Sequence, residues 1–360
     1  MSRPQVPLVP GTVSHKFEAM KKRFLSIPLC LFHFAFAEPI HGDLLNARDR
    51  VEREAGGLYD GRFEDGTSFQ MELGYPRPAS PADGSAPELG NAYWYPAHFT
   101  GQVISLAAEH RADDRIALSW KGDLGKEEQE KFLIALAPDR LSGVGTWTSA
   151  KLGKTMSLKI QRTVLYHSVI VTRPSQEAQA NGDKRQFVFS AIFPLLNDPQ
   201  ANDWVRQQAG TCEGDIECAN SVKVTWNSGA LKSLSAGIWN YNLGTPHGNY
   251  YSLIRHYRPE DRNWKELKLS SFIVPSQACQ AKVSALIVAK LRAQNLSSAE
   301  NGALSMRNEP KFKPTPVGIS FEFDPYEVGS YAEGAPSVFL TRAQLGGCTK
   351  ELPTSNRLGL

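Results

Sequence analysis

The chain has 360 residues, of which 41% are hydrophobic and 21% are charged, and its formal net charge is +3. This length is sufficient for two domains with separate cores. The positive charge is concentrated at one end: residues 1–37 hold five of the 40 Lys/Arg and one of the 37 Asp/Glu. The remaining 323 residues have a net charge of −1, which excludes the clustered positive charge that a nucleic-acid partner requires.

Residues 20–37 have the layout of a secretory signal peptide. Basic residues at 21–23 precede an apolar stretch at 24–34 that is too short to span a bilayer as a helix. The segment Ala35-Phe36-Ala37 is a small-x-small cleavage site. We therefore expect cleavage after Ala37.

The position of this segment predicts a different start for the protein. A signal peptide begins at the N-terminus, so Met20 is the expected first residue and residues 1–19 a misassigned start. Leu29 precedes Cys30 where a lipobox needs a small residue, which argues against a lipoprotein. The expected product is a soluble periplasmic or secreted protein with no stable membrane insertion.

Residues 38–164 are predicted to form a β-rich domain, either a small sandwich or a barrel. A short helix is expected first, ended by Gly56-Gly57. Its apolar residues are Leu44, Leu45, Ala47, Val51 and Ala55. Short alternating segments follow, and Asp65-Gly66 is typical of a hairpin turn. An aromatic group suggests a sugar-binding face, although packing in the core or at an edge is favoured. This group contains Tyr93, Trp94, Tyr95 and Trp147.

Residues 165–350 are predicted to form an α+β domain, with helices packed on a mostly antiparallel sheet. Asp198 is an expected N-cap for a helix that ends at Gly210. The clearest helix is capped by Ser276 and ends near Asn295. Its expected apolar face contains Ala278, Ala281, Ala285, Val288 and Ala289, with Leu286 and Ile287 beside them.

Further along, the alternation at 318–323 predicts a strand whose apolar side chains face the core. These side chains are Ile319, Phe321 and Phe323. Pro325 cannot donate to a ladder, so Asp324-Pro325 is expected to end the strand. Residues 351–360 are expected to be a tail.

Four cysteines remain after the expected cleavage, and an even number in an exported chain favours two disulfides. Three pairings are possible. We favour Cys212 with Cys218 and Cys279 with Cys348, because the first two flank one short polar loop. A zinc site is less favoured, since the spacing is not C-x-x-C and no histidine is close to either pair in sequence. We predict no metal and no other cofactor.

His247 is the histidine most suited to chemistry, because it lies in a turn between Pro246 and Gly248. With Glu327 or Asp324 nearby in the fold, it could form an acid/base pair. A histidine that hydrogen-bonds its own turn is the favoured alternative. Common catalytic motifs are missing from the sequence, so His247 and Glu327 are only weak catalytic candidates.

Residues 314–345 resemble the C-terminal signature of a bacterial extracytoplasmic domain family of unknown function. The matching positions are Phe321, Phe323, Pro325, Tyr326, Glu327, Tyr331, Ala332 and Gly334. A second element, "NLGTPHGNY", resembles the family's Gly-Gly-Ala-His-Gly turn through Gly244, His247 and Gly248. Thr245 and Pro246 depart from that turn. The resemblance covers about residues 165–346.

The family includes the outer domain of a lysozyme-binding anti-sigma factor and a domain found beside peptidoglycan deacetylase modules. The resemblance therefore implies a non-catalytic binding protein of the cell envelope, with peptidoglycan or a lysozyme-like muramidase as its partner. The expected binding residues are Tyr326, Glu327, Tyr331, Glu333 and His247. For the two tyrosines, packing over the sheet edge is the favoured alternative. The alternative function is an envelope glycan- or ester-hydrolysing enzyme that uses His247 with Glu327.

Overall fold

The computed structural model describes only part of the chain. The described residues are 51–75, 91–94, 103–110, 115–120, 130–150, 152–174, 182, 186–214, 216–228, 231–260, 263–304, 310–350 and 352. All of them belong to one compact unit, Pro39–Leu360. The predicted signal peptide, its cleavage site, the extension before Met20, Cys30 and nearly all of the predicted tail lie outside these residues.

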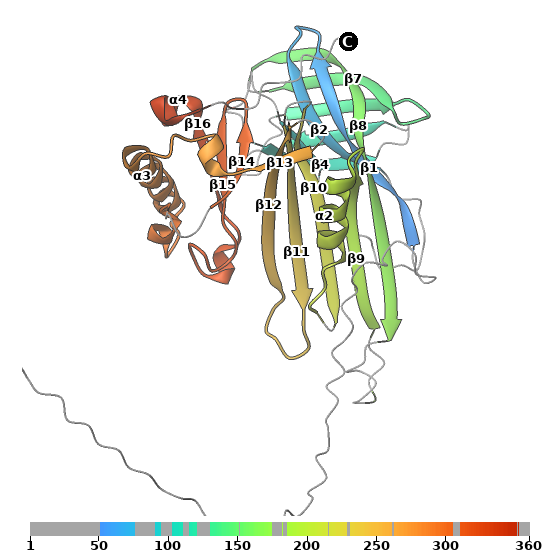
Figure 1. Ribbon diagram of the computed structural model, residues 1–360. Helices are drawn as coiled ribbons and strands as arrows, with labels where there is room; N and C mark the ends of the chain where they lie inside the picture. Colours follow the sequence, from blue (N-terminus) through green and yellow to red (C-terminus); the bar gives the residue numbers. More distant parts are fainter. Residues whose placement is uncertain are drawn as a thin grey trace, which may run out of the picture. The chain divides into compact units, whose positions relative to one another are not determined.

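The described chain is mostly β, with a large mixed sheet and few helices (Figure 1). Thirteen strands follow one another across this sheet in chain order. They are β1 Val51–Phe63, β2 Ser68–Gly74, β3 Asn91–Trp94, β4 Val103–His110, β5 Ile116–Trp120, β6 Glu130–Leu136, β7 Ser142–Ser149, β8 Lys154–Pro174, β9 Gln186–Leu195, β10 Glu217–Asn227, β11 Lys232–Tyr241, β12 Asn249–Glu260 and β13 Asn263–Leu267. Each neighbouring pair is antiparallel except β9 and β10, which are parallel and joined through α2 (Pro199–Gly210).

The first eight strands close on themselves, because β1 pairs with both β2 and β8. The predicted turn at Asp65-Gly66 is confirmed, with Gly66 at a φ of 85° between β1 and β2. Large side chains that are at most 2% exposed fill the inside of this ring: Tyr59, Phe63, Phe69, Phe132 and Trp147. Trp147 is therefore a core residue rather than part of a binding face. Tyr95 and the side chains of Tyr93 and Trp94 lie outside the described part.

The predicted short helix is wrong at its C-terminal end, because Val51 and Ala55 lie in β1. Leu44, Leu45 and Ala47 lie outside the described residues. β1 has hydrogen-bonded neighbours on both sides, β2 and β8. Pairing on two edges satisfies the backbone groups of this segment more completely than a short isolated helix, which is marginal in water.

The predicted boundary between residues 164 and 165 falls inside β8. This strand pairs with β7 in its first half, with β9 in its second half and with β1 along both. A buried contact reinforces the continuity: the hydroxyl of Tyr166 donates to Glu72 (3.0 Å) and accepts from the backbone of Val224 (2.8 Å). A separate sandwich followed by a separate α+β domain is therefore not confirmed; one strand serves both regions.

The two predicted helix starts are confirmed. Asp198 accepts a hydrogen bond from the backbone of Ala201 (3.2 Å) at the start of α2, which packs on β9, β10 and β11 (Figure 1). Ser276 accepts one from Cys279 (3.2 Å) at the start of α3, which runs over Gln277–Ala293. These side chains satisfy backbone donors that have no partner within the helix.

The structure corrects part of the predicted apolar face of α3: Val288 and the neighbouring Ile287 are buried, and the alanines are not. Ala278, Ala281, Ala285 and Ala289 are exposed, and the buried residues are Cys279, Val283, Ile287, Val288 and Leu291. Cys279, Val283, Ile287 and Leu291 are spaced four apart, so they form one stripe of the helix. The stripe with the larger side chains buries more apolar area than an alanine stripe does, and it therefore decides which way the helix faces.

A second, three-stranded sheet contains β14 Lys311–Thr315, β15 Gly318–Glu322 and β16 Ser337–Thr341. The predicted core positions of β15 are confirmed: Ile319 and Phe321 are 0% exposed, and Phe323 is 8% exposed. This sheet shares a core with α3. Short helices complete the described elements: η1 Leu269–Ser271, η2 Ala299–Gly302, η3 Tyr331–Glu333, α4 Arg342–Leu345 and η4 Gly346–Cys348.

Both predicted disulfides are confirmed. Cys212 and Cys218 connect the end of α2 to β10, with a sulfur–sulfur distance of 1.94 Å. Cys279 and Cys348 connect α3 to η4, with a distance of 2.10 Å. Within the described residues, no helix has both the length and the apolar character needed to cross a bilayer.

Candidate functional site

The predicted site begins where β15 ends, in a tight turn over residues 324–327. The backbone N–H of Glu327 donates to the carbonyl of Asp324 (3.1 Å), Pro325 is the second residue, and Tyr326 is the third with a φ of 71°. These are the features of a type II turn, whose third position usually holds Gly or Asn. A tyrosine there is strained by roughly 1–3 kcal/mol.

Asp324, the first residue of this turn, is only 8% exposed and anchors the turn to neighbouring strands. Its carboxylate accepts hydrogen bonds from the backbone N–H of Ser252 (3.0 and 3.1 Å) and from the hydroxyl of Ser252 (2.7 Å). It also accepts from the ammonium group of Lys311. The turn is thereby tied to β12, which carries Ser252, and to β14, which carries Lys311.

Glu327 holds the turn from inside. Its Oε2 accepts from the backbone N–H of Asp324 (2.8 Å), and its Oε1 accepts from Lys311 Nζ (2.9 Å). Lys311 therefore forms ion pairs with two carboxylates at once, those of Asp324 and Glu327. Because this side chain is already engaged in the turn and its ion pair, the acidic character it presents to a partner is reduced.

His247 meets the turn from the loop between β11 and β12. Its imidazole stacks on the ring of Tyr331, with centroids 3.8 Å apart and 14° between the planes. Nε2 is 3.0 Å from the hydroxyl of Tyr326, and Nδ1 is 2.9 Å from the carbonyl of Gly248. A carbonyl only accepts, so Nδ1 carries the proton, and in the neutral ring Nε2 accepts from Tyr326.

Gly248 is required beside His247 for steric reasons. A Cβ at this position would lie 2.5 Å from the ring of Trp239 on β11. The absence of a side chain lets the loop fold closely over the hairpin, which places His247 against Tyr331. This explains the His-Gly pair of the sequence motif as a packing requirement.

Glu333 fixes the far end of the turn. Its carboxylate accepts from the backbone and hydroxyl of Ser297 (both 2.7 Å) and from the backbone of Ser330 (2.6 Å). The hydrogen bonds from Ser330 and then Ser297 favour the anion and lower the pKa of Glu333 to about 2. Glu333 thus holds the short helix η3, where Tyr331 lies.

The structure brings three of the five predicted binding residues into direct contact: His247, Tyr326 and Tyr331. Glu327 and Glu333 lie on the same turn but hold it in shape. The partners described for His247 are tyrosines and a carbonyl; Glu327 is not among them. Sequence reasoning missed Ser252 and Lys311, which anchor Asp324. Neither lies in a motif, so no local signal in the sequence indicated them.

Comparison with known proteins places this turn within a recognisable segment. Residues 270–343 match the family described as "Protein of unknown function (DUF3298)". A DUF3298 family protein from Pseudomonas aeruginosa PAO1 has a crystal structure with 17% sequence identity and a TM-score of 0.39, covering 52% of this chain and 95% of that chain. A DUF3298 family member from Bacteroides fragilis NCTC 9343 has 13% identity and a TM-score of 0.36, covering 52% of this chain and 94% of that chain.

No curated protein matches the chain. Tyr326 and Tyr331 lie inside the matched segment, whereas His247 precedes it. Residues 270–343 are therefore similar to DUF3298, which is described as a family of unknown function.

Proposed function

We propose that this protein is an exported binding protein of the cell envelope, which recognises peptidoglycan or a lysozyme-like muramidase through an aromatic surface. That surface, the tyrosine–histidine surface, is made of His247, Tyr326 and Tyr331. The observation that carries the proposal is Tyr326, which is 61% exposed although its backbone φ is 71°. A large aromatic side chain in a strained position that buries little area contributes little to folding.

Strained residues that stay exposed are concentrated at functional sites, where the surrounding structure holds them in place. Here the supporting contacts are the Asp324 and Glu333 hydrogen bonds described above. Such a surface is ordered before it binds, so little conformational entropy is lost on association. Tyrosine is also enriched among the residues that contribute most to binding free energy.

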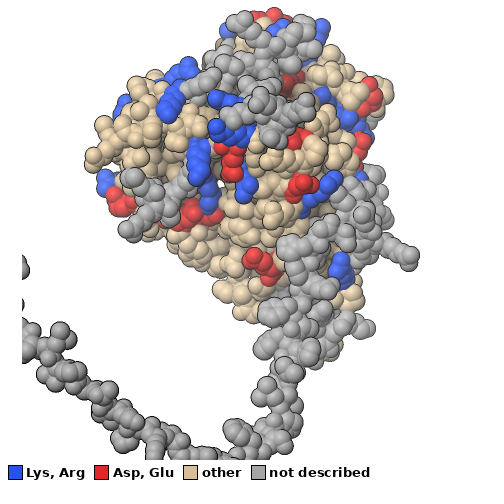
Figure 2. Space-filling model, viewed as in Figure 1, with Lys and Arg blue, Asp and Glu red and all other residues tan. Residues whose placement is uncertain are grey.

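Charge supports a local contact rather than long-range attraction. The predicted mature chain has a net charge of −1, and Figure 2 shows basic and acidic side chains side by side on the face in view. An interspersed surface gives little electrostatic steering. Binding would then depend on the exposed rings themselves, which can stack on sugars or fill pockets of a protein partner.

The two disulfides fit a periplasmic or extracellular protein, because such bonds persist in oxidising compartments. Export through the predicted signal peptide at 20–37 is part of this proposal. The proposal also includes the division of the chain into a β-rich region and an α+β region. The two partner classes come from the resemblance to an anti-sigma factor domain and to domains beside deacetylase modules.

The hydrolase alternative lacks a supporting contact. Both ring nitrogens of His247 are engaged, and Glu327 is paired with Lys311. A histidine in that arrangement has no lone pair directed at a substrate.

The test is capture by the secreted full-length product on two separate surfaces, peptidoglycan sacculi and immobilised lysozyme. Tyr326→Ala should weaken capture about 30-fold, the effect of losing about 2 kcal/mol at a central aromatic contact. Tyr326→Phe keeps the ring and removes only the hydrogen bond to His247, so it should weaken capture less.

Leu195→Ala, which removes a side chain that is 49% exposed on β9, is the matched control. Equal capture by wild type, Tyr326→Ala and Tyr331→Ala would exclude this surface, and capture on neither surface would exclude both partner classes.

A further inference from the structure

A second group of aromatic side chains lies on the hairpin of β11 and β12. We call this group, made of Trp239, Tyr241 and Tyr250, the β11–β12 platform. Trp239 and Tyr250 are cross-strand partners and Tyr241 lies two positions after Trp239, so the three side chains share one face of the sheet. α2 packs on the other face, where Asn220 on β10 donates to the carbonyl of Ala209 (3.0 Å) (Figure 1). The platform therefore lies on the face that α2 does not cover.

The platform continues from the tyrosine–histidine surface through the loop between its two strands. A Cβ at Gly248 would lie 2.5 Å from the ring of Trp239, so the loop is in close contact with this ring. The preceding residue, His247, stacks on Tyr331. The two surfaces are therefore adjacent, and a ligand longer than either one can contact both.

A glycine at position 237 allows Tyr250 to lie across β11. A Cβ there would be 3.1 Å from the hydroxyl oxygen of Tyr250 and 3.3 Å from its ring, which is tighter than an ordinary contact. Tyr250 extends from β12 over this position and is 37% exposed. Trp239 and Tyr241 have ring centroids 6.1 Å apart and 18° between their planes. The hairpin therefore presents aromatic rings close to its backbone, with area open to a ligand.

The side chains of β10 that share this face are small or polar. They are Glu217, Ala219 and Ser221, which pair with Tyr241, Trp239 and Gly237. Ala219 and Ser221 are too short to cover an aromatic ring, and both are partly exposed. Glu217 adds a carboxylate at the edge of the platform, which can accept a hydrogen bond from a hydroxyl group of a ligand.

The rings also carry hydrogen-bonding groups that the protein does not use. Within the described part of the chain, the hydroxyls of Tyr241 and Tyr250 and the indole N–H of Trp239 have no hydrogen-bond partner. Burial, followed by the charges of Asp324 and Glu322, raises the pKa of Tyr250, so its hydroxyl remains a donor at neutral pH. The same carboxylates oppose an anionic ligand. Rings with hydrogen-bonding edges beside carboxylates fit an uncharged ligand that has both an apolar face and hydroxyl groups, as a sugar does.

The size of the platform favours a glycan over a protein partner. From Gly237 to Tyr241 the strand rises roughly 13 Å, and the distance from β10 to β12 is two strand spacings, roughly 10 Å. Their product is roughly 130 Å², whereas each partner in a stable protein complex buries about 800 Å². The platform is longer than one sugar ring, so an oligosaccharide fits it better than a monosaccharide does.

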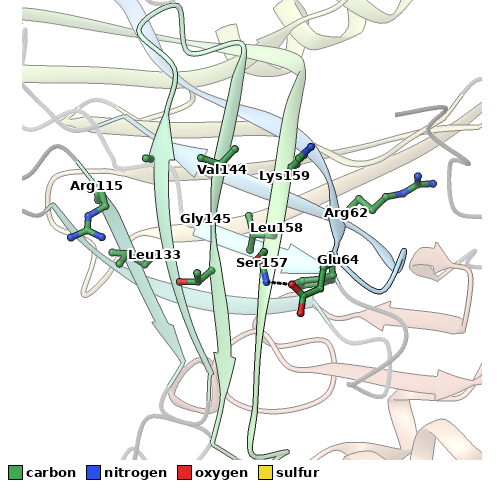
Figure 3. Close-up of a pocket in the computed structure, with 12 residues that line it drawn as sticks. Arg62, Glu64, Arg115, Leu133, Val144, Gly145, Ser157, Leu158 and Lys159 are labelled. Carbon is green, nitrogen blue, oxygen red and sulfur yellow. Dashed lines mark hydrogen bonds between the residues drawn. The ribbon is translucent and has the colours of Figure 1, made fainter.

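A cavity formed by β6, β7, β8 and the end of β1 lacks these features. It has a volume of about 660 Å³, and Figure 3 shows the aliphatic side chains of Leu133, Val144 and Leu158 among those that line it. The aromatic residue among the described lining residues is Phe63, which is only 2% exposed. A ligand that stacks on aromatic rings is therefore expected at the platform and not in this cavity.

We propose that the β11–β12 platform binds the glycan strand of peptidoglycan, an uncharged chain of β-linked N-acetylhexosamines. The apolar faces of the sugar rings stack on Trp239, Tyr241 and Tyr250, and the carboxylate of Glu217 accepts a hydrogen bond from a sugar hydroxyl. This inference rests on the proposed function and selects peptidoglycan from its two partner classes. It adds a site with its own residues, which can be tested separately.

The experiment measures binding of chitohexaose, a soluble uncharged chain of β-linked N-acetylglucosamine, to the full-length secreted protein by calorimetry. Tyr250→Ala should weaken binding about tenfold, because it removes an exposed ring from the platform. Tyr251→Ala is the matched control: it removes the same side chain from the next position of β12, on the opposite face of the sheet, and should leave the affinity unchanged. Hexagalacturonate has a similar length and a carboxylate on each sugar, so it should not bind at the same concentration.

Thermal melting checks that both variants fold, and Tyr241→Ala provides a second test of the platform. The proposal is overturned by lack of chitohexaose binding to the wild type, by equal affinities of Tyr250→Ala and Tyr251→Ala, or by equal binding of hexagalacturonate. Capture on peptidoglycan sacculi separates the two sites. Loss of capture in Tyr326→Ala but not in Tyr250→Ala would exclude the platform and keep the proposed function, whereas loss only in Tyr250→Ala would keep the platform and exclude the tyrosine–histidine surface.

Discussion

His247 and His256 belong to the same hairpin, β11–β12, and their surroundings are opposite. His256 on β12 is 2% exposed; its Nε2 donates to the carbonyl of Phe312 (2.8 Å), and its Nδ1 accepts from the hydroxyl of Ser233 (2.9 Å). Burial, reinforced by the charge of Lys313, lowers the pKa of His256 to about 3. His247 lies in the loop, partly exposed, against two tyrosines.

These surroundings indicate different roles for the two histidines: a structural role for His256 and a binding role for His247. His256 connects β12 to β14 and lies among Phe272 and Phe312, so it contributes to the core of the C-terminal region. Among the described residues, His247 forms hydrogen bonds and ring contacts with Tyr326, Tyr331 and Gly248. Changes around His256 should therefore alter stability, whereas changes around His247 and Tyr326 should alter binding.

The largest expected effect on the free energy of unfolding comes from the core of the C-terminal region, where Cys279 and Cys348 form a disulfide. Its sequence separation is 69 residues, so in the chain-entropy model it stabilises the fold by about 4 kcal/mol. The disulfide between Cys212 and Cys218 spans only six residues and contributes about 2 kcal/mol. Urea unfolding of the two double Cys→Ser variants measures the difference. Equal losses would show that loop length does not govern their contributions.

Replacing the buried histidine comes next. His256→Ala should lower the free energy of unfolding by about 3 kcal/mol, because it leaves a cavity and two polar groups without their partner. His247→Ala, its matched control, should cost less than about 1 kcal/mol. Urea unfolding of both variants at pH 7 gives the comparison, and a larger loss for His247→Ala would reverse the assigned roles.

Acid should destabilise the protein through His256. Its folded pKa is about 3 and its ordinary value is 6.5, so the unfolded chain takes up a proton that the folded protein excludes. Stability is therefore complete above pH 6.5 and is lost as the pH falls toward 3, with about 2 kcal/mol lost between pH 7 and pH 5. Unfolding free energies measured across this window should show the slope. His256→Gln should flatten it, and an unchanged slope in that variant would assign the effect to other groups.

The smallest expected change in the free energy of unfolding comes from relieving the backbone strain at Tyr326. Tyr326→Gly should raise the free energy of unfolding by about 1 kcal/mol, because glycine adopts a positive φ without strain. Tyr331→Gly should lower it, since Tyr331 lies in a short helix and is stacked on His247. Thermal melting distinguishes the two signs. A destabilised Tyr326→Gly would mean that this turn is held by its tyrosine rather than strained by it.

Local chemistry in the sequence determined a large part of this structure. The caps Asp198 and Ser276, the turn at Asp65-Gly66 and the alternation in β15 involve residues within a few positions of one another. Such contacts are specified by short-range hydrogen bonds and side-chain periodicity, which can be recognised in a single chain. The short loop between Cys212 and Cys218 also favoured the correct disulfide pairing among three possible ones.

Tertiary structure alone decided the features that join distant segments. β1 became a strand because it pairs with β8, about a hundred positions later, which outweighed its local helical pattern. The same pairing places Arg62 opposite Lys159, and packing of the hairpin against the turn places His247 on Tyr331. The buried face of α3 and the contacts of Asp324 with Ser252 and Lys311 also depend on segments that are far apart in the chain. Their free energy comes from burial and from hydrogen bonds between residues far apart in the chain, and no short stretch of sequence contains both partners of such a contact.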